Sequence, residues 1–133
     1  MKYMLDTNIC IFLIKNKPPS VLQKLNEAKQ DGIAISTITL AELEHGVAMS
    51  ANVQKNADAL AQMLTLIDVL PFDSTAAYHY GLILADLQRK GELIGPLDML
   101  IAGHAIAGGF TVVTNNTCEF SRVDRLAVED WTI

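Results

Sequence analysis

The stretch YMLDTNIC, residues 3–10, begins as a short apolar run and changes abruptly to a carboxylate, a hydroxyl and an amide. An unbroken apolar run over residues 2–5 is typical of a strand buried on both faces. Asp6 then stands where a helix N-cap belongs, because residues 7–17 have the apolar spacing of a helix. Taken alone, Asp6 fits a helix cap as well as it fits a functional site.

Strands and helices are expected to alternate along the rest of the chain. Further short strands are expected over residues 33–36, 69–72, 110–114 and 126–133. Helices are expected over residues 19–32, 36–50, 52–68, 74–90 and 96–107. This order predicts an α/β fold with a short, mainly parallel sheet flanked by helices. Because 133 residues suit one core and no linker or repeat interrupts them, a single domain over residues 1–133 is expected.

The composition is that of a compact globular protein, with 50% hydrophobic and 19% charged residues. With 10 basic and 15 acidic residues, the net charge of −5 excludes nucleic-acid binding by bulk charge, so such binding needs a local basic surface or bound cations. The two cysteines, Cys10 and Cys118, do not make a disulfide framework. No segment approaches the roughly 18 apolar residues of a membrane span. A cytoplasmic protein without a membrane partner is therefore expected.

Four acidic residues fall at predicted strand ends or helix starts that are far apart in the sequence: Asp6, Glu42, Asp98 and Glu119. In open parallel sheets, functional sites form beyond the carboxyl ends of the strands. Carboxylates gathered there repel one another unless cations or protons compensate their charge. Mg²⁺ and Mn²⁺ prefer such oxygen ligands. The pattern predicts a divalent-cation site, and a metal-dependent phosphodiesterase is the reaction that fits it.

Four motifs contain these acids, and their series resembles that of the PIN-domain ribonucleases, most closely the VapC toxins of type II toxin–antitoxin pairs. They are MLDTNICI (4–11), ITLAELEHG (38–46), IGPLDMLIAGHA (94–105) and VVTNN (112–116) with EF two residues on. The motifs occur in order over nearly the whole chain. The resemblance implies the PIN-like three-layer α/β/α fold.

The resemblance also implies roles for the acids. Asp6, Glu42 and Asp98 match the residues with which such enzymes hold Mg²⁺, with Mn²⁺ as the alternative. The fourth acid of the family is more variable, and this chain offers only asparagines in the turn at 115–116. Glu119 is the candidate to supply that charge from one helical turn later, which leaves open whether one metal ion or two are bound.

Polar neighbours of the acids match residues that orient the carboxylates or the water shell of the metal in the family. These supporting residues are Thr7, Asn8, Thr114, Asn115 and Asn116. Two cations that follow the fourth acid, Arg122 and Arg125, are the candidate contacts for RNA phosphates.

The function implied by the resemblance is that of an endoribonuclease toxin. Such an enzyme activates water for attack on an RNA phosphodiester without a covalent intermediate and leaves 5′-phosphate and 3′-hydroxyl ends. The favoured substrate is tRNA ahead of mRNA, with loss of translation and growth as the result. The expected partners are a cognate VapB-like antitoxin and a second copy of the chain, with a higher oligomer in the antitoxin complex and operator DNA bound only through the antitoxin.

Three other functions were weighed against this one. A receiver-type phospho-acceptor domain needs an acidic pair after its first strand and a lysine after its last, and the chain has neither. A haloacid-dehalogenase-like phosphatase needs an aspartate two residues after Asp6, where Asn8 stands. A non-catalytic co-repressor, acting only in a complex with antitoxin and operator, stays open as the alternative.

Overall fold

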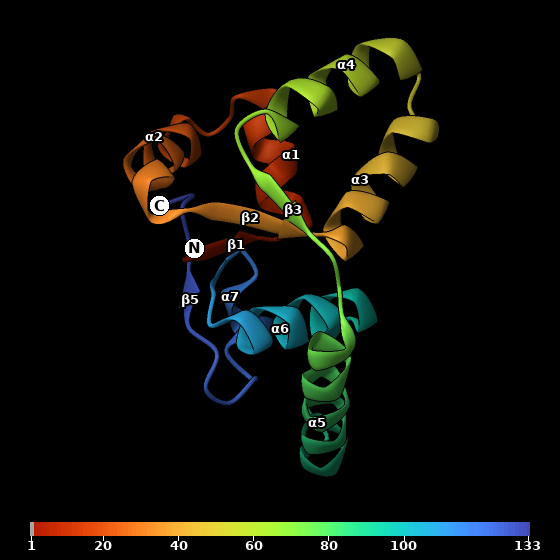
Figure 1. Cartoon of the computed structure of the whole chain (residues 1–133), viewed down its shortest axis with the longest axis vertical. Coiled ribbons are helices and arrows are strands. Elements are labelled where there is room, and N and C mark those ends of the chain that lie inside the picture. The colour runs from red at the N-terminus through yellow and green to blue at the C-terminus, as the bar shows by residue number, and fades with distance from the viewer. Residues whose placement is uncertain (1) are drawn as a thin grey trace.

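The computed structural model describes residues 2–133 and contains one parallel sheet. Its strands are β1 (Tyr3–Leu5), β2 (Ile33–Ser36), β3 (Asp68–Leu70), β4 (Thr111–Val113) and β5 (Val128–Glu129). The five strands lie in the order β3-β2-β1-β4-β5, and every neighbouring pair is parallel. The strand that begins the chain is therefore the centre of the sheet (Figure 1). The expected parallel α/β class is confirmed.

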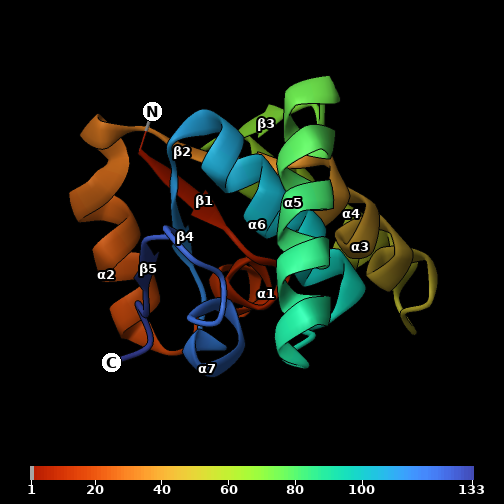
Figure 2. The same ribbon diagram turned by 90° about the horizontal axis from the view of Figure 1, so that it is seen from below.

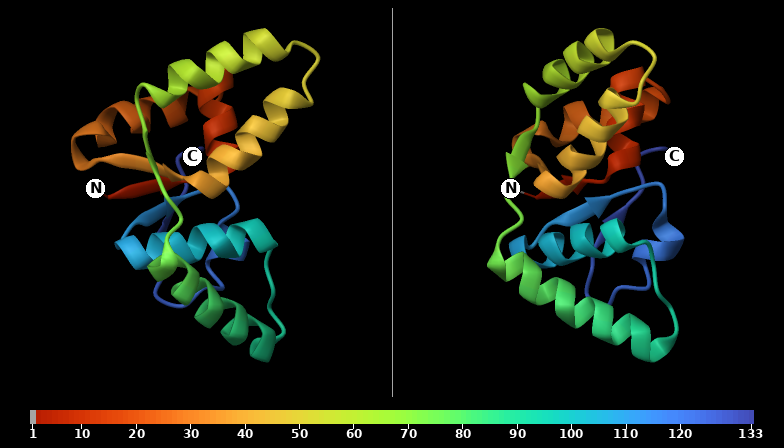
Figure 3. Two further views of the ribbon diagram at one scale, coloured as in Figure 1. Left: turned by 45° about the vertical axis from the view of Figure 1, so that its right-hand side comes forward. Right: turned by 90° about the vertical axis from the view of Figure 1, so that its right-hand side faces the viewer.

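Helices cover both faces of the sheet. They are α1 (Thr7–Lys15), α2 (Pro19–Ala28), α3 (Thr37–Ala48), α4 (Val53–Leu64), α5 (Ser74–Lys90), α6 (Pro96–Gly108) and the single turn α7 (Thr117–Phe120), with a 3-10 turn η1 (Lys29–Asp31) after α2. The first four helices lie on one side of the sheet, and α5 and α6 lie on the other (Figures 1 and 3). This arrangement confirms the expected three layers.

The buried side chains of β1 explain why its sequence is apolar without interruption. Tyr3 and Leu5 pack into the core under α1–α4, whereas Met4 packs into the core under α5 and α6. All three side chains are buried because adjacent residues of a strand point to opposite faces and both faces are covered.

Individual residues explain where four helices begin and why α5 and α6 lie close together. The side chains of Asp6, Ser36, Asn52 and Asp73 each accept a hydrogen bond from an N–H in the first turn of α1, α3, α4 and α5 respectively. On α6, a Cβ at Gly103 would lie 2.8 Å from the backbone nitrogen of Tyr80. The missing side chain therefore lets α5 and α6 approach closely, and the pair forms the outer layer.

Several predicted boundaries were wrong, among them those of β3, β5 and α4. The strand expected at 69–72 lies at β3 and stops before Pro71, which has no N–H for the ladder. The strand expected at 126–133 pairs only at β5, because Trp131 turns into the core, where its ring packs edge-on against Tyr3 with centroids 5.3 Å apart. Helix α4 ends at Leu64, whereas the apolar pattern extends to 68. Nowhere in residues 2–133 is a helix both long and apolar enough to cross a membrane.

Candidate active site

The four acids predicted from the sequence come from four elements that meet at the carboxyl edge of the sheet. Asp6 follows β1, Glu42 lies in α3 after β2, and Glu119 lies in α7 after β4. Asp98 lies in the first turn of α6, which runs back along the sheet so that its start reaches the same edge. Figure 2 shows α1 after β1 and α7 after β4 at the same end of the sheet.

Asp6 is the most buried of these acids, with 4% of its surface exposed. Its Oδ1 accepts a hydrogen bond from the N–H of Ile9 at 3.0 Å and so caps α1. Its Oδ2 accepts one from the hydroxyl of Thr114 at 2.5 Å. Burial raises the pKa of Asp6, and the neighbouring charge of Glu42 adds to that rise, whereas the hydrogen bonds from Thr114 and Ile9 oppose it. The carboxylate thus serves the helix cap through one oxygen and faces the site with the other.

A chain of hydrogen bonds connects Asp6 to Glu119. While the Thr114 hydroxyl donates to Asp6, it accepts from the backbone N–H of Asn116 at 2.8 Å. The side-chain amide of Asn116 then donates to Glu119 Oε2 at 2.7 Å. An aspartate at 116 could not donate this bond and would repel Glu119. The asparagine that departs from the family pattern is therefore matched to Glu119, while Asn115 is exposed in the turn.

Glu42 has its own supporting residue. The hydroxyl of Thr7, the first residue of α1, donates to Glu42 Oε1 at 2.7 Å. This bond crosses from α1 to α3 and fixes one oxygen of a side chain that is only partly buried. The neighbouring Asn8 is exposed and lines the surface hollow beside Glu42.

Asp98 carries the clearest electrostatic sign of a functional site. It is half-buried at the start of α6, and its Oδ2 lies 3.3 Å from the place that a Cβ on Gly95 would occupy. Burial, followed by the charges of Asp6, Glu119 and Glu42, raises the pKa of Asp98 to about 6. The four carboxylates therefore act on one another, as acids gathered at functional sites do.

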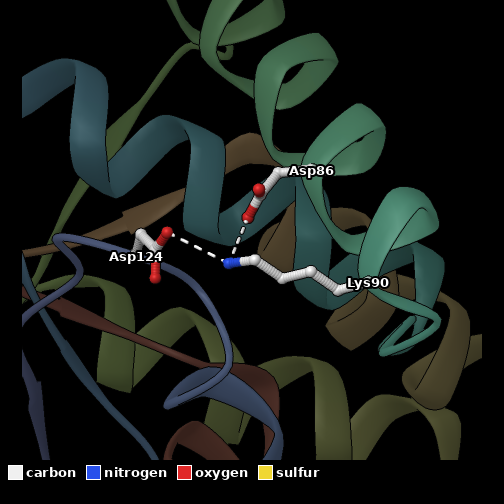
Figure 4. Close-up of polar contacts among 3 residues, drawn as sticks. All are labelled: Asp86, Lys90 and Asp124. Carbon is white, nitrogen blue, oxygen red and sulfur yellow. Dashed lines mark hydrogen bonds and ion pairs between the residues drawn. The ribbon is translucent and has the colours of Figure 1, made fainter.

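No basic side chain compensates these acids through an ion pair within residues 2–133. Both ion pairs found there are made by Lys90, with Asp86 on the same helix at 2.9 Å and with Asp124 at 3.1 Å (Figure 4). They involve α5 and the segment after α7, and none of the four acids takes part. The negative charge at the carboxyl edge is thus left without an ion-pair partner, which favours a bound cation.

The donor set fits a hard divalent cation that keeps part of its water shell. In the described chain no three His, Cys, Asp or Glu side chains converge closely enough to enclose an ion by themselves. Mg²⁺ usually binds proteins through one or two carboxylates and retains several waters. Asp6 and Asp98, with Glu42 directly or through water, would supply such oxygens.

The two predicted RNA-binding arginines are not brought together. Arg122 Nη1 donates to the backbone carbonyl of Leu93 at 3.0 Å and so connects the segment after α7 to the loop before Asp98. Arg125 lines a separate groove with His79 and Asp86 on α5. The contact between Arg122 and Leu93 was missed from the sequence, because no local pattern connects residues so far apart.

The chain is thus an α/β protein with a three-layer fold, and its acids gather at the carboxyl edge of a parallel sheet. In proteins of this class the functional site lies at that edge. Residues 3–126 match the family model of the PIN domain, and the chain belongs to that family, within its VapC branch.

Relatives and solved structures of this branch match the chain over nearly its full length. It is 48% identical over 132 residues to the tRNA(fMet)-specific endonuclease VapC of Shigella flexneri, covering 99% of each chain. It is 43% identical to ribonuclease VapC2 of Rickettsia felis, covering 98% of each. The crystal structure of VapBC2 from Rickettsia felis, bound to a DNA fragment from its promoter, superposes with a TM-score of 0.94 at 41% identity, over 98% of this chain and 99% of that one. DNA-bound VapBC from Salmonella typhimurium gives 0.93 at 44% identity, covering 98% of each.

Proposed function

We propose that this chain is a magnesium-dependent endoribonuclease toxin that cleaves tRNA and is held inactive by a VapB-like antitoxin. The observation that carries the proposal is that four carboxylates from separate elements meet at one edge of the sheet without an ion-pair partner. Burial, followed by the charges of the other three acids, raises the pKa of Asp98 to about 6. The names of the relatives support it, since they include a tRNA(fMet)-specific endonuclease and further VapC ribonucleases.

The residues of the chain would act mainly by holding and orienting groups. Mg²⁺ or Mn²⁺, when bound, supplies activation of a water and neutralisation of phosphoryl charge. Asp6 and Asp98 hold the cation, and its charge stabilises their ionised forms. Thr114 fixes Asp6, Thr7 fixes Glu42, and Asn116 fixes Glu119, so the carboxylates are ordered before substrate arrives. Such preorganisation is the main contribution of a protein to phosphodiester hydrolysis.

Partner binding is part of the same proposal. Solved structures similar to this chain include VapBC complexes, two of them bound to DNA, which supports a VapB-like antitoxin and contact with operator DNA through it. The net charge of −5 and the acidic edge suit an antitoxin that presents a basic side chain to the site. A homodimer, and a higher oligomer with antitoxin, complete the expected assembly.

A non-catalytic co-repressor is the second candidate, since one of these structural relatives, VapBC2 from Rickettsia felis, is bound to a DNA fragment from its promoter. It predicts that the chain purified without antitoxin leaves RNA intact under all conditions. The ordered carboxylates would then have no chemical use, and their mutual repulsion would be an uncompensated cost.

The decisive experiment is cleavage of total tRNA by the partner-free protein with Mg²⁺, with Mn²⁺ and with EDTA. We expect cleavage with either metal and none with EDTA, and a loss of at least about 100-fold in Asp98→Asn. The matched control is Asp58→Asn, which changes an exposed aspartate on α4 that accepts only from Gln54. Full cleavage by Asp98→Asn, or cleavage that persists in EDTA, would refute the metal mechanism. Intact tRNA under every condition would favour the co-repressor.

A further inference from the structure

A surface hollow of about 550 Å³ lies beside the acidic site, between the starts of α1 and α6 and one face of α3. We call it the α1–α3–α6 hollow. Its lining includes Ile11, Ile38 and Leu97 as apolar surface, with Asn8 and His45 as polar groups. The mechanism proposed above uses none of these five side chains.

The hollow is continuous with the acidic site. Thr7 and Glu42, which are joined by a hydrogen bond, line the hollow as well as the site. Leu97 is the residue immediately before Asp98. A polynucleotide with one phosphate at the acids must therefore place a neighbouring residue at or beside this hollow.

The chemistry of the hollow selects the part of the nucleotide that can enter. Glu42 contributes a carboxylate, and no lysine or arginine lines the hollow, so a second phosphate is disfavoured there. Apolar side chains suit the flat faces of a nucleobase, and Asn8 is an amide that can pair with a base edge. His45 lies three residues after Glu42 on α3, hence on the same side of the helix, and its ring is exposed. An exposed imidazole can stack on a base.

We infer that the α1–α3–α6 hollow binds the nucleobase that adjoins the cleaved phosphodiester, with His45 stacking on the base and Asn8 reading its polar edge. The inference rests on the proposed function and deepens it, because it assigns substrate selection to residues outside the acids. The hollow thereby makes cleavage depend on an unpaired base, since a base inside a duplex cannot enter it.

The test uses a stem-loop RNA that contains the cleavage site mapped on tRNA. His45→Ala is expected to raise KM about tenfold and to leave kcat within about twofold, as befits loss of one stacking contact. His45→Phe keeps an aromatic face and is expected to stay within about threefold of the parent protein. The control is His79→Ala, which removes a partly buried histidine from the groove on α5, away from the acids.

A second readout does not require cleavage. In an Asp98→Asn background, fluorescence anisotropy with the intact stem-loop should show the same tenfold weakening on His45→Ala. Replacing one flanking base by an abasic residue should weaken RNA binding about tenfold in the protein that keeps His45. The same replacement should hardly weaken binding further in His45→Ala, because both changes remove the same contact.

Each other outcome has a defined meaning. The inference would be overturned if the losses of affinity from the abasic residue and from His45→Ala add. An unchanged KM in His45→Ala, or a rise in KM in His45→Phe as large as that in His45→Ala, would also overturn it. If His45→Ala converts a dimer to a monomer in sedimentation velocity and its RNA affinity follows that change, the hollow is an interface between copies, and the inference also fails. If the parent protein leaves tRNA intact, the proposed function fails by itself. The anisotropy comparison is then made with a single-stranded RNA oligonucleotide, in which every base is unpaired, and it still decides whether the hollow binds a base.

Discussion

Replacing Asp98 by Asn should stabilise the metal-free protein at high pH, although it abolishes the proposed activity. Asp98 ionises beside Asp6, Glu42 and Glu119, and burial together with these charges raises its pKa from 3.8 to about 6. The folded state therefore binds the Asp98 proton more tightly than the unfolded state does. Between pH 3.8 and about 6 the unfolded chain loses this proton first, so the free energy of unfolding falls as the pH rises.

The size of the effect follows from the shift. About two pKa units correspond to about 3 kcal/mol, at about 1.36 kcal/mol per unit. Asp98 is only half-buried, so solvent screening reduces the expected penalty to about 1–1.5 kcal/mol. The favourable interaction of the carboxylate with the start of α6, worth roughly 0.3–1 kcal/mol, is lost in the variant and acts in the opposite direction. From the middle of each range, we expect the stability of Asp98→Asn relative to the parent protein to be about 0.6 kcal/mol higher at pH 8 than near pH 4.

Urea unfolding in EDTA, at pH 4 and at pH 8, measures this difference for both proteins. Asp58→Asn serves as the control, since its exposed carboxylate on α4 lies outside the acidic group. Adding Mg²⁺ at pH 8 should reverse the order, because the ion stabilises the parent protein by about 2.7 kcal/mol at 100 times its Kd and the variant by less. A gain that is the same at both pH values, or equal stabilisation of both proteins by Mg²⁺, would refute the reasoning.

Two further predictions concern positions that support the site. Thr114→Val keeps the volume but removes the hydroxyl that donates to Asp6 and accepts from Asn116, so cleavage of tRNA should fall about 10- to 100-fold, and Ser at 114 should restore most of it. Gly103→Ala places a methyl group 2.8 Å from the backbone nitrogen of Tyr80, and urea unfolding should show a loss of about 1–3 kcal/mol, whereas Gly81→Ala, with open space around its Cβ position, should not destabilise the protein.

The sequence contains enough information to predict the acids and the layers. Asp6 and Glu119 follow apolar strands, and parallel strands bring such positions to one edge. Asp98 follows Gly95-Pro96, a helix start that any α/β arrangement with covered faces places against the sheet. A parallel sheet covered on both faces follows from the same alternation of strands and helices, whereas the strand order β3-β2-β1-β4-β5 was not predicted.

The contacts that order the site could not be predicted in the same way. The hydrogen bond from Thr114 to Asp6 spans 108 residues, and that from Thr7 to Glu42 spans 35. Such contacts depend on register, which short strands leave undefined in the sequence. The predicted length of β5 was wrong for a related reason. The burial of Trp131 ends the pairing, and no local pattern reveals which apolar residue leaves the strand.

The central place of β1 means that the candidate site is complete only late in the synthesis of the chain. β1 pairs with β2 and with β4, and the Thr114 that fixes Asp6 directly follows β4. A nascent chain that has emerged only as far as α6 therefore has Asp6, Glu42 and Asp98 but lacks the strand and the hydroxyl that order the first of them. Under the proposed function, chains truncated before β4 are therefore expected not to cleave RNA.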